Sequence, residues 1–246
     1  MPIEDFTYDA YRDFINLIRE NGYEFINYHD SHEGGKKCII RHDVDSRLES
    51  ALILGELEND IGLRSTYFVL LRTDMYNVFS KRCIDILCRL QSMGHEIGLH
   101  FDEFFFEGED IGIDIKEEII KEADIFTEAT GREIKVVSMH RPSKKTMEAD
   151  YLFDNIENSN SKKFTEGFKY LSDSRMVWRE NVVDAIKSDE YQKLHISVHP
   201  GWYKEEKNTI GENLRGFIDS ASEERFRYLS ENIFDLESIL SERESK

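Results

Sequence analysis

The chain has 246 residues, of which 39% are hydrophobic and 12% aromatic, enough for one α/β barrel or two small domains with buried cores. Its formal net charge of −18 disfavours nucleic acids and anionic membranes as partners, because like charges repel. No apolar run approaches the roughly 18 residues that a membrane-spanning helix requires.

Hydrophobic patterning predicts that helices and strands alternate along the chain. Apolar residues spaced by three and four predict helices over residues 6–22, 51–62, 80–93, 115–130 and 220–242. Short runs rich in β-branched and aromatic residues predict strands at 38–43, 66–70, 96–100, 134–139 and 193–198. Gly131 is expected to cap the helix that precedes it.

This alternation predicts a mostly parallel sheet covered by helices. We expect one domain over residues 1–246, with the helices at 6–22 and 220–242 as additions to it. Residues 143–178 are polar and irregular, and we expect them to form a long loop inserted over the functional site.

The N-terminus and the cysteines bear on localisation. The first residues, Met1 to Phe6, have neither the basic start nor the apolar segment of a secretory signal. Cys38, Cys83 and Cys88 lack the spacing of a zinc ribbon or a disulfide framework. We therefore expect a cytoplasmic protein.

Two aspartates stand at the end of the first strand. In extended backbone, Asp43 and Asp45 face the same way, so one carboxylate could bind a cation while the other accepts a proton. Helix capping is the alternative, and it could account for Asp45 but poorly for Asp43. A buried carboxylate needs a partner, which favours the functional interpretation.

The role expected for each histidine likewise depends on its position along a strand. His100 ends the strand at 96–100 and, because it should converge with Asp45, we expect it to be a metal ligand. His95 begins the same strand, and His42 alternates away from Asp43, so both are expected to be structural.

Two further strand ends carry Arg141 and His199, each close to a proline that ends the strand. Arg141 could bond a carboxylate through two of its nitrogens and hold it ionised. His199, with a near-neutral pKa in ordinary surroundings, is suited to protonate a leaving group.

These blocks together resemble the motifs of the polysaccharide deacetylase superfamily, the metal-dependent chitin, xylan and peptidoglycan deacetylases. The resemblance covers about residues 36–203 and rests on Arg-His-Asp-Val-Asp, Ser-Thr-Tyr-Phe, Gly-His-Glu-Ile-Gly-Leu-His, His-Arg-Pro-Ser and Val-His-Pro-Gly-Trp in that order. These segments look like a subgroup associated with surface-polysaccharide biosynthesis. The implied fold is an α/β distorted (β/α)7 barrel in a single domain.

The resemblance also implies roles for individual residues. Asp43 would be the general base, Asp45 and His100 metal ligands, and His199 the general acid. Arg141 would orient the base and Asp173 would pair with that arginine. Trp178 and Trp202 would contact the substrate as aromatic walls of its groove.

One position departs from the family pattern. The second metal histidine is usually four residues after the first, and here that position is Phe104, which cannot bind a metal. His140 is the favoured replacement, because zinc prefers imidazole and a catalytic site takes three protein ligands plus water. Asp102, or no third protein ligand, are the alternatives.

The sequence thus predicts a hydrolase that uses a divalent metal, foremost zinc, to remove an acyl group, foremost acetyl, from an N- or O-acetylated sugar. An intracellular glycan precursor is the expected substrate. The rival hypothesis is a non-catalytic carbohydrate-binding relative in a polysaccharide assembly system, which the loss of the usual histidine at Phe104 would favour. An amidase acting on a non-sugar amide would share the mechanism.

Overall fold

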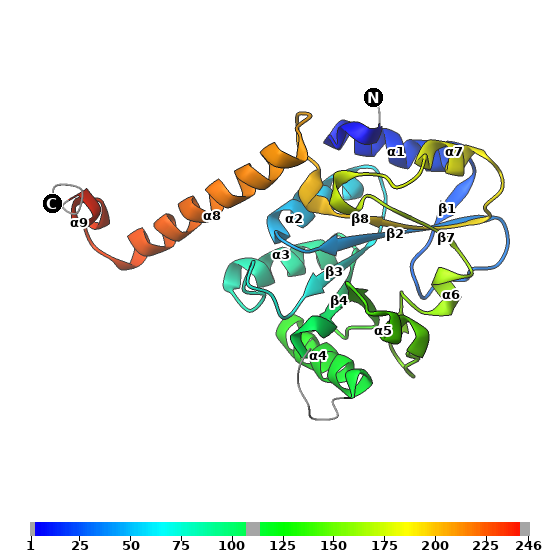
Figure 1. The fold of residues 1–246 in the computed structure, drawn as a ribbon, viewed down its shortest axis with the longest axis horizontal. Coiled ribbons are helices and arrows are strands. Elements are labelled where there is room, and N and C mark those ends of the chain that lie inside the picture. Colours follow the sequence, from blue (N-terminus) through cyan, green and yellow to red (C-terminus); the bar gives the residue numbers. More distant parts are fainter. Residues whose placement is uncertain (1–2, 107–113, 242–246) are drawn as a thin grey trace. The chain divides into compact units, whose positions relative to one another are not determined.

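The computed structural model describes residues 3–106 and 114–241. The chain forms two compact units, residues 1–205 and 206–246. In the first unit, parallel strands form a curled sheet with helices outside it, a distorted (β/α)7 barrel as the sequence predicts (Figure 1). The strand order is β6-β5-β4-β3-β2-β8-β7, and β1 pairs with the first residues of β2. The one-domain organisation of the whole chain stays a prediction.

The helices and strands follow the expected alternation. The strands are β1 (Tyr23–Phe25), β2 (Lys36–Val44), β3 (Thr66–Leu70), β4 (Glu96–Asp102), β5 (Val136–His140), β6 (Glu157–Asn158), β7 (Lys169–Ser172) and β8 (Lys193–Val198). The α-helices of this unit are α1 (Tyr8–Glu20), α2 (Leu48–Asp60), α3 (Lys81–Ser92), α4 (Ile115–Thr130), α5 (Lys144–Ala149), α6 (Lys162–Thr165) and α7 (Val182–Lys187). Gly131 ends α4 at φ 68°, which confirms the predicted cap.

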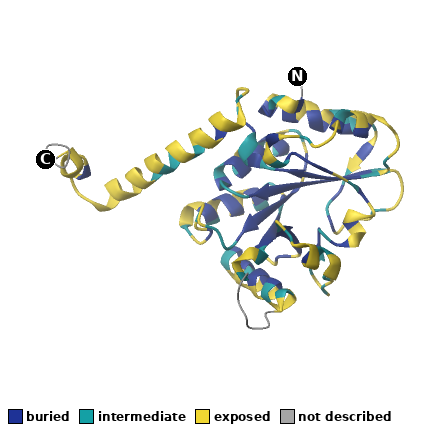
Figure 2. Cartoon of the chain, viewed as in Figure 1, coloured by how far each residue is buried: buried dark blue, intermediate teal, exposed yellow. Residues whose placement is uncertain are grey.

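The central strands are buried on both faces. Every residue of β3 is buried, and so is every residue of β2 after Lys36, as the dark blue strands of Figure 2 show. Outside the sheet, α1 is capped by the Thr7 side chain and turns an apolar stripe inward. Burial on both faces explains why β3 and the Cys38 to Ile40 part of β2 read as apolar runs in the sequence.

The expected long loop at 143–178 is wrong. The chain there forms α5, β6, α6, β7 and the 3₁₀ turn η3 (Ser174–Met176). Strand β6 pairs with β5 and β7 pairs with β8, so this region completes both edges of the sheet. With only two and four residues, these strands are too short to give a periodic pattern, and their tertiary pairing with apolar neighbours decides their conformation.

The second unit contains α8 (Ile210–Asn232) and α9 (Leu236–Ser241). Helix α8 begins well before the predicted residue 220, because Thr209 and Glu212 form a capping box at its start. The predicted end at residue 242 lies outside the described residues. Among the described residues, no helix combines the length and apolar character needed to cross a membrane.

A buried carboxylate ties the first helices to the back of the sheet. Glu58 on α2 is fully buried, as are His42 and His95. The predicted structural roles of both histidines are confirmed, since His42 Nε2 lies 2.8 Å from the carboxylate and His95 Nε2 lies 2.9 Å from the Gly55 carbonyl oxygen. The hydroxyl donors to Glu58 are Tyr11, Ser65 at 2.6 Å and Tyr67 at 2.8 Å.

Glu58→Gln is expected to change how the free energy of unfolding depends on pH in the acid range. Burial raises the pKa of Glu58, but the nearby His42 and His95 and the hydrogen bonds of His42 and Ser65 lower it to about 2, from about 4.5. Because the folded pKa is the lower one, this stabilisation is complete above about pH 4.5 and is lost as the pH falls towards 2. Urea unfolding of wild type and of the variant should be measured at about pH 4.5 and at about pH 2. Between these two pH values the free energy of unfolding of wild type should fall by roughly 3 kcal/mol more than that of the variant. Equal losses would contradict the role given to Glu58.

Candidate active site

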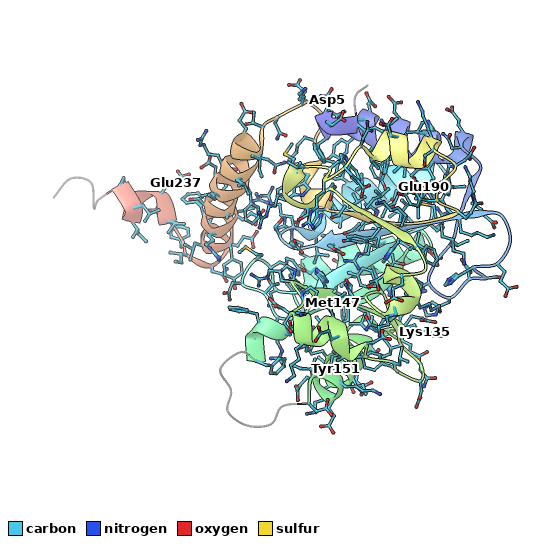
Figure 3. The ribbon with its side chains drawn as sticks, turned by 45° about the vertical axis from the view of Figure 1, so that its right-hand side comes forward. Asp5, Lys135, Met147, Tyr151, Glu190 and Glu237 are labelled. Atoms are coloured by element: carbon cyan, nitrogen blue, oxygen red, sulfur yellow. The ribbon has the colours of Figure 1, made fainter. Side chains whose placement is uncertain are left out.

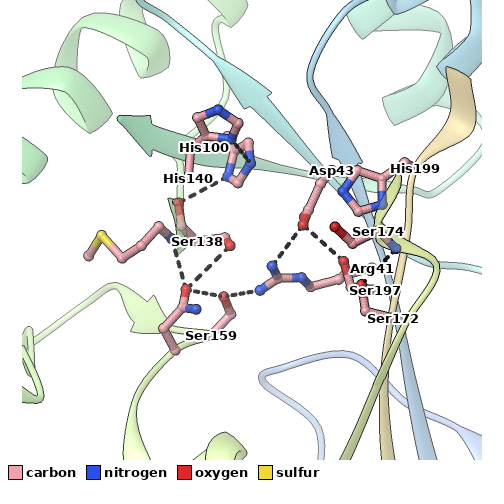
Figure 4. Close-up of polar contacts among 12 residues, drawn as sticks. Arg41, Asp43, His100, Ser138, His140, Ser159, Ser172, Ser174, Ser197 and His199 are labelled. Atoms are coloured by element: carbon pink, nitrogen blue, oxygen red, sulfur yellow. Dashed lines mark hydrogen bonds and ion pairs between the residues drawn. The ribbon is translucent and has the colours of Figure 1, made fainter. Parts of the chain in front are cut away.

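The carboxyl ends of the parallel strands open into one pocket of about 720 Å³. Asp43 and Asp45 enter it from β2, His100 from β4, His140 from β5 and His199 from β8. Figure 4 shows several of these side chains converging from neighbouring strand ends. In barrel enzymes, this end is where catalytic residues lie.

Asp43 is held at the bottom of the pocket through one carboxylate oxygen. Its Oδ2 accepts hydrogen bonds from Arg41 Nη2 at 2.8 Å and from Ser197 Oγ at 2.9 Å (Figure 4). Its Oδ1 is buried and accepts no hydrogen bond from any described residue. Burial alone would raise the pKa of Asp43, but Arg41, His100 and His199 lower it well below its usual range. The carboxylate is therefore ionised and keeps one oxygen free.

The arginine that holds Asp43 is Arg41, and the expectation that Arg141 does so is wrong. Arg141 Nη2 donates to Asp102 Oδ2 at 2.8 Å, and 64% of the Arg141 side chain is exposed. Arg141 follows β5 with φ 49°, which ends the extended backbone. Arg41 could have been found from the sequence, because it is two residues before Asp43 and so faces the same side of β2.

Replacing each arginine by methionine tests this correction. Arg41→Met leaves the buried Asp43 carboxylate without its ion pair and should lower the free energy of unfolding by about 3–5 kcal/mol. Arg141→Met breaks an exposed pair and should cost no more than about 1 kcal/mol. Urea unfolding at neutral pH measures both, and the reverse order would return the pairing role to Arg141.

Asp45, His100 and His140 form a group that could hold a metal ion. One ligand atom from each lies within 4.8 Å of the others. Asp45 Oδ1 is buried without a hydrogen-bond partner among the described residues, and it lies 3.4 Å from His100 Nε2 and from His140 Nδ1. An acceptor aimed at two imidazole nitrogens fits a divalent cation.

The protonation of the two imidazoles also suits a metal. His100 Nδ1 lies 3.2 Å from the Ser138 carbonyl oxygen, so Nδ1 donates its proton there and Nε2 keeps a lone pair (Figure 4). Burial and the neighbouring His100 lower the pKa of His140, which favours the neutral imidazole that a metal requires.

The alternative third ligand, Asp102, is engaged elsewhere. Its carboxylate accepts the hydrogen bond of Arg141 and is not part of the metal group. Phe104, at the position of the usual second histidine, is 62% exposed, and its ring centroid lies 5.5 Å from the Arg141 guanidinium carbon. This geometry favours His140 as the third ligand, which stays a prediction.

His199 is positioned by Asp173 rather than left free. Its Nδ1 lies 2.6 Å from Asp173 Oδ1, and its backbone N–H donates to the same carboxylate at 3.0 Å. Tyr203 also donates to Asp173. Burial lowers the pKa of His199, but Asp173 outweighs it and raises the value to about 9. The expected pairing of Asp173 with an arginine is therefore wrong: Asp173 holds the imidazolium with Nε2 on the pocket side, 3.8 Å from Asp45 Oδ2.

The two tryptophans differ in position. Trp202 lines the pocket, with its ring centroid 6.3 Å from that of His199. Trp178 packs against Phe14 of α1, with the two ring centroids 5.2 Å apart, and it does not line the pocket. The expected contact of Trp178 with the substrate is therefore wrong. The sequence placed Trp178 near the site because it follows Asp173 closely, but the intervening turn η3 directs it to the outer helix layer.

Several polar residues of the pocket wall were missed in the sequence. Ser159 accepts a hydrogen bond from Arg41 Nη1 at 2.9 Å, and Asn160 Oδ1 accepts from the Met139 backbone N–H at 2.8 Å. Both follow β6, whose two residues give no sequence signal. Met147 of α5 also lines this wall (labelled in Figure 3).

Comparisons with known proteins found no match in sequence and several solved structures of low similarity. No family profile matches the chain, and no curated protein matches it in sequence. One similar solved structure is a family 4 carbohydrate esterase from Bacillus anthracis, with 16% identity, 85% of this chain and 86% of that one covered, and a TM-score of 0.41. Another is a polysaccharide deacetylase from Bacillus cereus, with 13% identity, coverage of 77% and 88%, and a TM-score of 0.42.

A third similar structure is a family 4 pseudoenzyme from Bacillus anthracis, with 12% identity, coverage of 78% and 63%, and a TM-score of 0.43. Identities and TM-scores this low assign neither a family nor an activity to the chain.

Proposed function

We propose that this protein is a metal-dependent hydrolase that removes an acetyl group from an N- or O-acetylated sugar. One observation carries the proposal: a metal-competent group, an ionised carboxylate with a free oxygen and a protonated imidazole meet in one pocket. The order of motifs that resembles the polysaccharide deacetylases supports it. Binding alone would not require all three.

Different side chains would serve different steps of acyl transfer. Asp45, His100 and His140 would hold a divalent ion, which as a Lewis acid polarises a carbonyl and lowers the pKa of water. Asp43 Oδ1 is the free acceptor for the proton of the attacking water, while Arg41 and Ser197 fix its orientation through Oδ2.

His199 would finish the reaction. Its Nε2–H faces the pocket and can protonate the departing amine or alkoxide, and Asp173 stabilises the imidazolium until then. A pKa of about 9 keeps this imidazole protonated at neutral pH, before the leaving group departs. An acid is needed most for an amide, because an unprotonated amine leaves poorly.

His199→Ala separates this mechanism from its alternatives. The variant should lose about 10²–10⁴-fold in kcat/KM for N-acetylated sugars but much less for p-nitrophenyl acetate, whose phenolate leaves unaided. Steady-state kinetics on both substrates, with metal content measured in parallel, is the test. Equal losses on both substrates would point to a structural or metal-binding role for His199.

A non-catalytic carbohydrate-binding role is the second candidate, favoured by Phe104 at the usual histidine position. Metal-replete wild type that binds glycans but hydrolyses no acylated sugar would support it. Zinc as the ion, a cytoplasmic glycan precursor as the substrate and a role in surface-polysaccharide biosynthesis stay predictions from the sequence.

A further inference from the structure

The rim of the pocket is basic although the chain carries a net charge of −18. Arg141, Arg175 and Arg179 line it, and all three are exposed. The acids that line the same pocket, Asp43 and Asp45, belong to the catalytic group already described. The arginines therefore create a local positive charge where a substrate would enter.

Arg175 and Arg179 are not used to hold the fold. Among the residues that the structure describes, neither has an ion-pair or side-chain hydrogen-bond partner. Their guanidinium N–H donors are therefore available to a ligand that carries acceptor oxygens.

The backbone that presents Arg175 is strained. Arg175 has φ 62° and ψ 30°, and the next residue, Met176, has φ 57°. Such left-handed conformations are unfavourable for residues other than glycine and persist where the surrounding structure enforces them, often at ligand sites. The Met176 side chain is buried in the core, so it anchors the turn that leaves Arg175 on the rim.

Arg141 adds a third, fixed guanidinium. It also has a positive φ, 49°, and is held by Asp102 and by the ring of Phe104. Asp102 offsets part of the charge of Arg141 and accepts a hydrogen bond from its Nη2. The other N–H donors of the guanidinium group remain available to a ligand.

We infer that this pocket takes acylated sugars that carry an oxyanion, a phosphate or a carboxylate, which Arg175 and Arg179 bind at the rim. The inference rests on the proposed deacetylase function of the same pocket. The planar fork of arginine matches both oxyanions, and a pocket of about 720 Å³ has room for a monosaccharide with such a group.

Three substrates with and without an oxyanion test the inference: N-acetylglucosamine, its 1-phosphate and N-acetylmuramic acid. We expect wild type to prefer at least one charged sugar by about tenfold or more in kcat/KM, and 0.5 M NaCl to reduce the preference. The double variant Arg175→Gln, Arg179→Gln should lose this preference through a raised KM for the charged sugar. Arg132→Gln, an exposed arginine that does not line the pocket, is the matched control.

The outcomes separate this inference from the proposed function. Preference for the phosphate, the carboxylate or both supports the inference and identifies the oxyanion. Equal kcat/KM on all three sugars, or a preference that survives the double substitution, overturns it while the deacetylase proposal stands. If no sugar is hydrolysed, the deacetylase proposal fails, and calorimetric binding of the 1-phosphate decides the inference: binding that the double variant loses supports it, and absent or unchanged binding overturns it.

Discussion

Alanine at Asp45, His100 or His140 is expected to remove the bound metal and nearly all activity. Wild type purified without chelator should carry about one divalent ion per chain, and each variant should retain a small fraction of it, because a site with two protein ligands binds weakly. Loss of the metal removes several kcal/mol of transition-state stabilisation, so kcat/KM should fall about 10³-fold or more. Elemental analysis and kinetics on an acetylated sugar measure both effects.

Asp102→Ala is the control for this metal prediction. Asp102 is at the same rim, at the end of β4, but its carboxylate binds Arg141 and lies outside the metal group. The variant should keep its metal. If it loses the ion while His140→Ala keeps it, the third ligand is Asp102 and the assignment of His140 fails.

Asp43→Asn is expected to keep the metal and lower kcat by about a hundredfold or more, the usual scale for the loss of a general base. An amide nearly matches the carboxylate in shape but cannot take a proton at Oδ1. The variant also leaves Arg41 buried without its counter-charge, so it should be less stable. Kinetics should therefore be measured well below its melting temperature, with metal content determined on the same sample.

The matched control makes the same chemical change at another strand-end acid, the one that ends β4. Asp102→Asn breaks the pair with the exposed Arg141 and should leave kcat on a neutral acetylated sugar within about a few fold of wild type. Unchanged turnover in the Asp43 variant, or an equal loss in the Asp102 variant, would remove Asp43 from the mechanism.

Long, strongly patterned elements could be predicted from the sequence, and short ones could not. The strands at 66–70 and 193–198 have the predicted bounds, because burial on both faces demands an apolar run that is visible locally. Strands β6 and β7 were missed because they are only two and four residues long and form through pairing with β5 and β8. A two-residue strand has no periodicity to detect.

For the site, alternation along a strand and position at its end were the informative signals. They place Asp43, Asp45, His100, His140 and His199 around one pocket, as the sequence predicts, although their roles stay proposals. Alternation also indicates Arg41 as the partner of Asp43, a signal that was overlooked in favour of Arg141.

The sequence by itself determined the alternating fold and the set of strand-end side chains, because burial and parallel pairing leave local patterns of period 2 and 3.6. Only the tertiary structure decided which side chains from distant segments pair: Arg141 with Asp102, and Asp173 with His199. The positions of Trp178 and of the rim arginines were likewise decided there. Such partners are joined by turns with positive φ and by contacts between distant segments, and neither is encoded in the spacing of residues along one strand.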